Sequence, residues 1–138
     1  MDSFFFTLFL IHYKILVEVI VILLIIYPKC STCIKAKKYL EDKSISFDIR
    51  DIVLDKLNVD ELKKYINLSK LDINRFFNTS GMKYRELGLK DKMSTLTDDE
   101  KLKLLASDGM LVKRPILVCD NKVLVGFKEK EWSEIKWD

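Results

Sequence analysis

The chain has 138 residues, of which 49% are hydrophobic and 33% are charged. This length supports one well-packed domain and is too short for two ordinary ones. The 24 basic and 21 acidic residues are interleaved along the chain, which argues against a nucleic-acid-binding protein with its clustered basic surface. Three cysteines are too few for a disulfide-rich secreted scaffold, so we expect a reducing, cytoplasmic setting. A four-ligand zinc site would need every cysteine and the single His12, but Cys119 is distant and His12 lies in an apolar run, so we expect no bound metal.

The N-terminal segment is apolar from Phe4 onward and is long enough to cross a membrane. Anchoring through residues 4–24 is therefore one interpretation. Lys14 and Glu18 disfavour it, because charged side chains are costly near the centre of a bilayer, and no Lys or Arg precedes the run.

The second half of this run predicts a buried strand from about Ile20 to Tyr27, because it is dense in β-branched residues and ends at Pro28. We therefore interpret residues 1–17 as an apolar extension or a start-site artefact. Residues 18–138 are the predicted folded domain.

Strand and helix patterns alternate after Pro28. A helix is expected from Ser31 to about Leu40, with Ile34 on its apolar side, and a half-buried strand over residues 46–52. A helical middle follows, with helices expected at Val59–Ile66, at Ile73–Phe77 and after a capping box at Thr97–Glu100.

Two strands, Ile116–Cys119 and Lys122–Val125, flank an Asp-Asn turn and predict a β-hairpin, followed by a helix over residues 129–135. The order β-α-β, helices, β-β, α is that of an α/β protein with a thioredoxin-like fold. We expect a central mixed sheet with an inserted helical region.

Cys30 follows the first strand and opens the first helix, and Cys33 lies three residues later. Free N–H groups at the helix start, the helix dipole and the neighbouring Lys29 all favour the Cys30 thiolate. Cys33 lies one turn further along the same helix face, within reach of a disulfide. The pair therefore predicts an attacking and a resolving thiol, although a lone C-x-x-C also occurs for packing reasons.

Arg114-Pro115 lies just before the hairpin. Thioredoxin-like folds keep a cis-proline at this place, facing the dithiol; the alternative is an ordinary trans proline at a strand start. Arg114 is a candidate for binding an anionic substrate or the thiolate, or else a solvated surface arginine. Cys119 is interpreted as a small buried hydrophobe, and Gly81 and Gly88 as positive-φ turn residues.

Four ordered motifs resemble the arsenate reductase (ArsC)/Spx family over about residues 20–137, most closely its uncharacterised C-x-x-C reductase-like members. The motifs are Tyr27-Pro28-Lys29-Cys30-Ser31-Thr32-Cys33, then Phe76-Phe77-Asn78-Thr79-Ser80-Gly81 with Tyr84-Arg85-Glu86-Leu87-Gly88-Leu89, then Lys113-Arg114-Pro115-Ile116, and Val125-Gly126-Phe127. The resemblance implies a thioredoxin-like core, Cys30 as the nucleophile, and Arg114 as an oxyanion-contacting arginine beside a cis-Pro115.

This sequence departs from the glutaredoxin-coupled arsenate reductases of that family at the binding positions. Cys33 and Ile34 stand where those enzymes have serine and arginine, and two further arginine positions fall on Asn78 and Phe127. These departures disfavour arsenate reduction.

The leading hypothesis is therefore a monomeric thiol-disulfide oxidoreductase that needs no bound cofactor. Its electrons would come from an external thiol such as thioredoxin, glutaredoxin or glutathione, and its partner would be a thiol or disulfide protein or a small oxidised substrate. The alternatives are an Spx-like redox-sensing regulator that binds the RNA polymerase α subunit, and an arsenate reductase coupled to glutaredoxin or thioredoxin.

Overall fold

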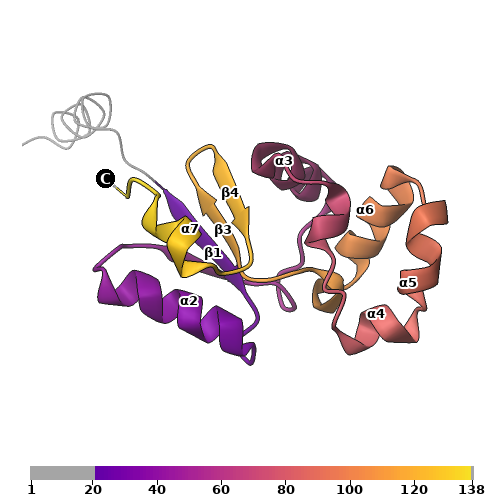
Figure 1. Ribbon diagram of the computed structural model, residues 1–138, viewed down its shortest axis with the longest axis horizontal. Coiled ribbons are helices and arrows are strands. Elements are labelled where there is room, and N and C mark those ends of the chain that lie inside the picture. Colours follow the sequence, from indigo (N-terminus) through magenta and orange to yellow (C-terminus); the bar gives the residue numbers. More distant parts are fainter. Residues whose placement is uncertain (1–20, 138) are drawn as a thin grey trace, which may run out of the picture.

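A computed structural model describes residues 21–137, which are built around one four-stranded mixed sheet (Figure 1). The strand order is β2-β1-β3-β4; β1 pairs in parallel with β2, and the other pairs are antiparallel. The strands are β1 (Ile22–Ile26), β2 (Asp48–Asp51), β3 (Ile116–Cys119) and β4 (Lys122–Val125). The α/β class, the mixed sheet and the thioredoxin-like arrangement are as predicted.

Helices cover both faces of the sheet, so the central strand β1 is apolar on both sides. Leu24 packs against α2 (Ser31–Asp42) and α7 (Glu129–Ser133), in a cluster that includes the fully buried Trp132. Ile25 faces the other way, into a cluster with α3 (Val59–Ser69) and the inserted helices. This double burial explains the continuous apolar run in the sequence.

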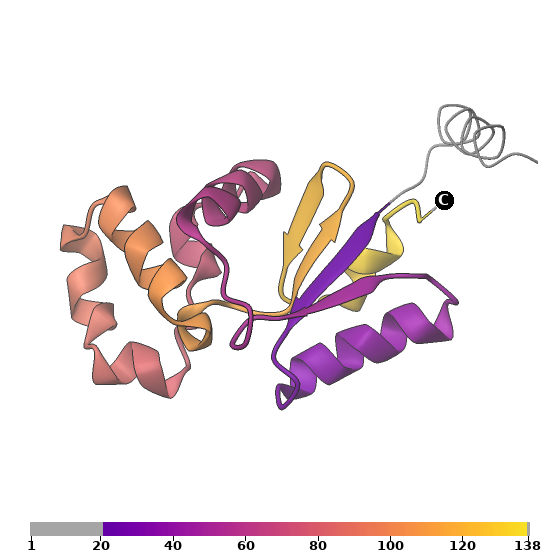
Figure 2. The same ribbon diagram turned by 180° about the vertical axis from the view of Figure 1, so that it is seen from behind.

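The inserted region lies beside the sheet, at one end of the molecule in both views (Figures 1 and 2). It contains η1 (Ile73–Phe76), α4 (Met82–Glu86), α5 (Leu89–Lys92), η2 (Met93–Thr95), α6 (Asp98–Ser107) and η3 (Gly109–Leu111). The predicted capping box is present: Thr97 accepts a hydrogen bond from the Glu100 backbone and Glu100 accepts one from the Thr97 backbone, which fixes the start of α6.

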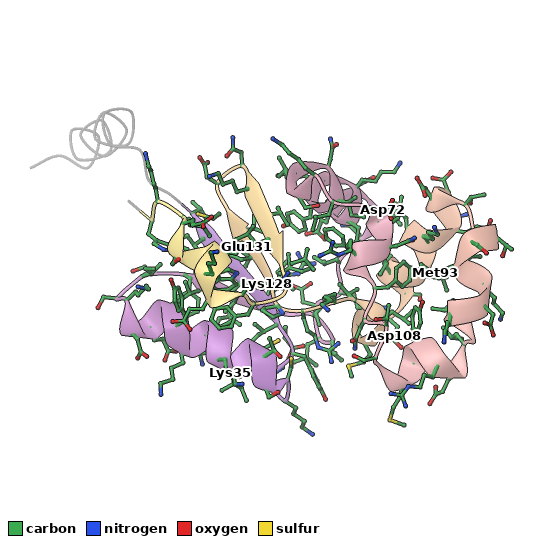
Figure 3. All side chains as sticks on the ribbon, viewed as in Figure 1. Lys35, Asp72, Met93, Asp108, Lys128 and Glu131 are labelled. Carbon is green, nitrogen blue, oxygen red and sulfur yellow. The ribbon has the colours of Figure 1, made fainter. Side chains whose placement is uncertain are left out.

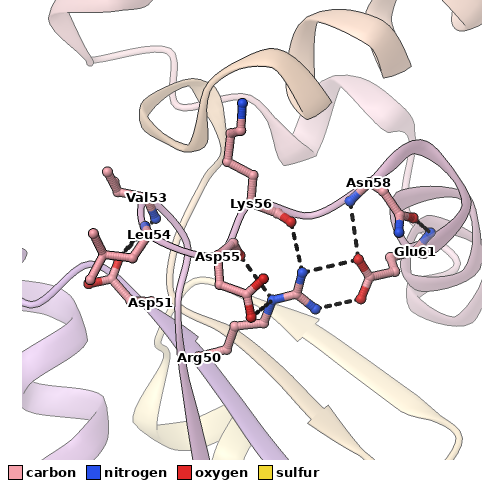
Figure 4. A network of polar contacts seen from close by, with 8 residues as sticks. All are labelled: Arg50, Asp51, Val53, Leu54, Asp55, Lys56, Asn58 and Glu61. Carbon is pink, nitrogen blue, oxygen red and sulfur yellow. Dashed lines mark hydrogen bonds and ion pairs between the residues drawn. The ribbon is translucent and has the colours of Figure 1, made fainter.

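An arginine on β2 holds the loop that leads to α3 (Figure 4). The Arg50 guanidinium binds both carboxylate oxygens of Glu61 and donates to the carbonyl oxygens of Asp55 at 3.0 Å and Lys56 at 2.8 Å. Glu61 also accepts a hydrogen bond from the backbone of Asn58 and so completes the N-terminal cap of α3. The hydrogen bonds to Arg50 hold the pKa of Glu61 below its ordinary value.

Two predictions of local structure are wrong. Ile34 is 57% exposed, because α2 turns Cys33, Ala36 and Tyr39 toward the sheet instead. Gly81 has a negative φ; glycine fits there because a Cβ would stand 2.6 Å from the side-chain nitrogen of Asn78.

Gly88 does have the predicted positive φ, and Asp120 in the hairpin turn has φ +55. The proposed extension, residues 1–17, lies outside the described residues, so its role stays a prediction. Within residues 21–137, no helix is long and apolar enough to cross a membrane.

Candidate active site

Cys30 is the N-cap residue of α2 and stands directly after the turn that leaves β1. The turn is closed by a hydrogen bond from the Cys30 N–H to the Tyr27 carbonyl at 3.0 Å. The Cys30 sulfur accepts a hydrogen bond from the Cys33 N–H at 3.4 Å, as the side chain of an N-cap residue does. Cys30 is partly exposed, whereas Cys33 is fully buried one turn along the helix, and both thiols are free.

The surroundings of Cys30 favour its thiolate. Partial burial by itself raises the pKa of Cys30, and hydrogen bonds from the side chain and N–H of Cys33 lower it. The positive charge of Arg114 and the N–H of Thr32 act in the same direction as these bonds. The pKa of Cys30 therefore lies below its ordinary value, as expected for an attacking thiol.

Cys33 is shifted the other way. Burial and the adjacent Cys30 sulfur raise the pKa of Cys33 to about 12, so it is a neutral thiol at physiological pH. The two sulfurs thus differ both in access and in charge.

Arg114 and Pro115 lie beside this pair, because β3 runs antiparallel to β1 and places Ile116 opposite Ile25, near the end of β1. The Arg114–Pro115 peptide bond is cis, and Pro115 is buried.

The Arg114 guanidinium is fixed in place. It stacks over the Tyr27 ring at 5.1 Å and donates to the carbonyls of Val112 at 3.3 Å and Met110 at 3.5 Å. Its Nε is buried and has no hydrogen-bond partner within the described part of the chain. The Nε donor is therefore unused in a guanidinium whose charge acts on the Cys30 thiol.

A cleft of about 640 Å³ opens next to Cys30 and Arg114. One wall comes from the inserted region and the other from the hairpin and the start of α7. The lining residues are Cys30, Thr32, Arg75, Asn78, Ser80, Gly81, Met82, Lys113, Arg114, Val125, Gly126, Phe127 and Lys128. Asn78 and Phe127, the two positions that the family resemblance aligns with arginines, both line this cleft.

Three cations of this cleft were missed by sequence reasoning: Arg75, Lys113 and Lys128. They lie on different elements, and no local motif joins them. Figure 3 shows Lys128 where the hairpin passes into α7.

Other candidate residues lie away from this site. Cys119 pairs with Ile22 at the opposite end of β1 from Cys30, and burial raises its pKa, which agrees with its interpretation as a buried hydrophobe. Lys35 is exposed on the outer side of α2 (Figure 3). Among residues 21–137, no three His, Cys, Asp or Glu side chains are grouped so that they could hold a metal ion.

A family model described as the ArsC family matches residues 25–135, which include the cysteine pair, Arg114 and the walls of the cleft. The chain belongs to the ArsC family.

The chain is similar to the uncharacterized protein YusI of Bacillus subtilis, which is 52% identical over 108 residues that cover 78% of this chain and 92% of YusI. The global transcriptional regulator Spx 2 of Bacillus anthracis is 28% identical over 102 residues, covering 74% of this chain and 76% of Spx 2. A crystal structure of an ArsC family related protein from Bacteroides fragilis superposes with a TM-score of 0.80 at 50% identity, covering 83% of this chain and 97% of that one. The predicted resemblance is confirmed.

The arrangement of this ArsC-family site suits nucleophilic thiol chemistry. It combines an accessible sulfur with a lowered pKa, a second sulfur one turn behind it, and a fixed cation with a free donor.

Proposed function

We propose that the protein is a thiol-disulfide oxidoreductase with Cys30 as the attacking residue, Cys33 as the resolving residue and Arg114 as the residue that supports the thiolate and contacts substrate. The observation that carries this proposal is the contrast between the two sulfurs. Cys30 lines a cleft and accepts a hydrogen bond at the start of α2, whereas Cys33 is buried and protonated behind it.

The reaction has two exchange steps. The Cys30 thiolate attacks one sulfur of a substrate disulfide, forms a mixed disulfide and expels one substrate thiolate. Cys33 then gives up its proton to the expelled thiolate or to water and attacks the Cys30 sulfur, which releases the second substrate thiol. Two electrons pass from the dithiol to the substrate, and an external thiol such as thioredoxin, glutaredoxin or glutathione restores the dithiol by the reverse exchange.

The charge on the Cys30 sulfur determines the order of these two steps. While Cys30 is a thiolate, its hydrogen bond and charge help to keep the proton on Cys33. The mixed disulfide removes that charge, so the pKa of Cys33 falls after the first step and its attack becomes easier.

The direct test uses three variants with oxidised glutathione as the probe. Cys33→Ser is expected to accumulate a mixed disulfide with one glutathione on Cys30, and Cys30→Ser is expected to form none, both read by mass spectrometry. Cys119→Ser, which removes a buried thiol at the far end of the sheet, is the matched control and is expected to form the Cys30–Cys33 disulfide as the unaltered chain does. Equal adduct formation in Cys30→Ser and Cys33→Ser would overturn the assigned roles.

A redox-sensing regulator is the second candidate, and the similarity to Spx 2 favours it. In this case the same disulfide acts as a switch and the partner is the RNA polymerase α subunit. Binding of that subunit by the reduced or the oxidised chain, measured by calorimetry, would support the regulator if the affinity changes at least tenfold on oxidation. Equal affinity of both forms, or no binding, would argue against it.

Arsenate reduction is the third candidate and is less well supported. The cleft carries Asn78 and Phe127 at the two positions where the resemblance expects arginine. Turnover of arsenate with glutaredoxin or thioredoxin would reverse this judgement.

A further inference from the structure

The cleft beside Cys30 is strongly biased in charge. Four of its thirteen lining residues are basic and none is acidic, although the whole chain has 24 basic and 21 acidic residues. Within residues 21–137, no carboxylate lies within ion-pair distance of these four cations, Arg75, Lys113, Arg114 and Lys128. Their charge is therefore available to a ligand, since no neighbouring acid neutralises it.

The fold gathers these cations from three separate segments. The Lys113 N–H donates to the Phe76 carbonyl at 2.7 Å, which ties Lys113 to the segment that carries Arg75. The Lys113 side chain passes over Gly126, where a Cβ would stand 3.8 Å from its Cε. Arg75 on the inserted region, Lys113 and Lys128 at the start of α7 therefore line the same cleft.

The size of the cleft and the charge of its walls indicate that its ligand is a small molecule. About 640 Å³ falls within the roughly 300–1,000 Å³ typical of small-molecule sites. Cations stand on both walls, and Arg114, which lines the cleft together with Cys30, adds a buried Nε that has no partner among the described residues. A disulfide that carries a carboxylate on each half can place its sulfur at Cys30 and its two negative charges against opposite walls.

We propose that the preferred substrates are small anionic disulfides, selected by Arg75, Lys113 and Lys128 in the cleft beside Cys30. This inference rests on the proposed function and names its substrate class. The three cations act as specificity residues, because they attract and orient the substrate without taking part in the exchange of sulfur bonds.

The test compares three short disulfides that differ in charge: dithiodipropionate is anionic, bis(hydroxyethyl) disulfide is neutral, and cystamine is cationic. The rate of oxidation of the reduced chain by each is divided by the rate of the same disulfide with mercaptoethanol, which removes differences in intrinsic reactivity. We expect the normalised rates to fall in the order anionic, neutral, cationic. The first and last are expected to differ by about tenfold or more at low salt and by less at high salt.

A triple variant locates the effect. Arg75→Gln, Lys113→Gln and Lys128→Gln together are expected to bring the three normalised rates to within about threefold of one another. The matched control removes three exposed lysines that do not line the cleft, by Lys64→Gln, Lys90→Gln and Lys103→Gln, and is expected to keep the order. Both triple variants lower the net charge equally, so a difference between them reports the cleft and not the whole chain.

Four results would overturn the inference. Equal normalised rates in the unaltered chain, or an equal loss of preference in both triple variants, would reject it and leave the oxidoreductase in place. Equal small-molecule rates together with a faster reaction of an acidic peptide disulfide would assign the cleft to a protein partner. Failure of all three disulfides to react would overturn the proposed function, and the inference with it.

Discussion

Gly109 of the inserted region lies close against the backbone that follows β2, and replacing it tests that packing. A Cβ at Gly109 would stand 2.2 Å from the carbonyl oxygen of Ile52 and 3.2 Å from the nitrogen of Val53. The two backbones would have to separate by about 0.8 Å to reach even 3.0 Å. Ile52 is fully buried and its N–H is bonded to the Ile26 carbonyl at 2.9 Å, so it resists this shift.

Overpacking of this kind costs about 1–3 kcal/mol, and a clash with backbone belongs at the upper end. We expect Gly109→Ala to lower the free energy of unfolding by about 3 kcal/mol. The matched control is Gly88→Ala, where a Cβ would stand 3.9 Å from the flexible end of Lys92 and only the φ of +63° opposes a side chain. That strain costs about 1–2 kcal/mol. Urea unfolding at 25 °C measures both; a cost for Gly109→Ala no larger than that for Gly88→Ala would refute the packing argument.

Three further predictions concern the active site and the Arg50–Glu61 pair that holds the loop between β2 and α3. At neutral pH, iodoacetamide is expected to label Cys30 and to leave Cys33 unmodified, because burial raises the pKa of Cys33 to about 12; mass spectrometry of the labelled peptides checks this. Arg114→Gln is expected to raise the pKa of Cys30, because it removes a positive charge that favours the thiolate. The rate of alkylation measured against pH would then shift to higher pH. Arg50→Met is expected to lower the free energy of unfolding by about 1–3 kcal/mol at neutral pH. Because the folded-state pKa of Glu61 is lowered, this difference should shrink as the pH falls below about 4.5 and through that pKa; a difference independent of pH would contradict the role of the pair.

The sheet and the position of the cysteine pair could be predicted from the sequence. The β-branched run before Pro28 predicts β1, the Asp-Asn turn predicts the β3–β4 hairpin, and the strand-to-helix order puts Cys30 at the start of α2. Each of these signals is local, since a few neighbouring residues contain it.

The inserted region was predicted only in outline. Helices α4 and α5 have 5 and 4 residues, which is too few to show a helical period. The burial of α2 was misjudged at Ile34, since apolar character alone does not say which side of a helix meets the sheet.

The charge of the cleft was not predictable from one sequence. Arg75 lies within the four-residue 3-10 helix η1 and Lys128 directly before a five-residue helix, and nothing in their neighbourhoods distinguishes them from the other exposed basic residues. The Phe77–Val112 bridge and the hydrogen bond from Lys113 to Phe76 join the segments of Arg75 and Lys113, and the end of the hairpin brings Lys128 to the same cavity. Contacts between residues this far apart in the sequence depend on the whole fold.

The most direct test of the proposed redox pair is the reduction potential of Cys30 and Cys33. It is measured by equilibrating the Cys119→Ser chain in glutathione buffers and counting the oxidised fraction by alkylation and mass spectrometry. We expect a two-electron transition between a dithiol and one internal disulfide, with a midpoint between roughly −270 and −180 mV. Absence of an internal disulfide even in excess oxidised glutathione would contradict it and leave the two cysteines a structural role.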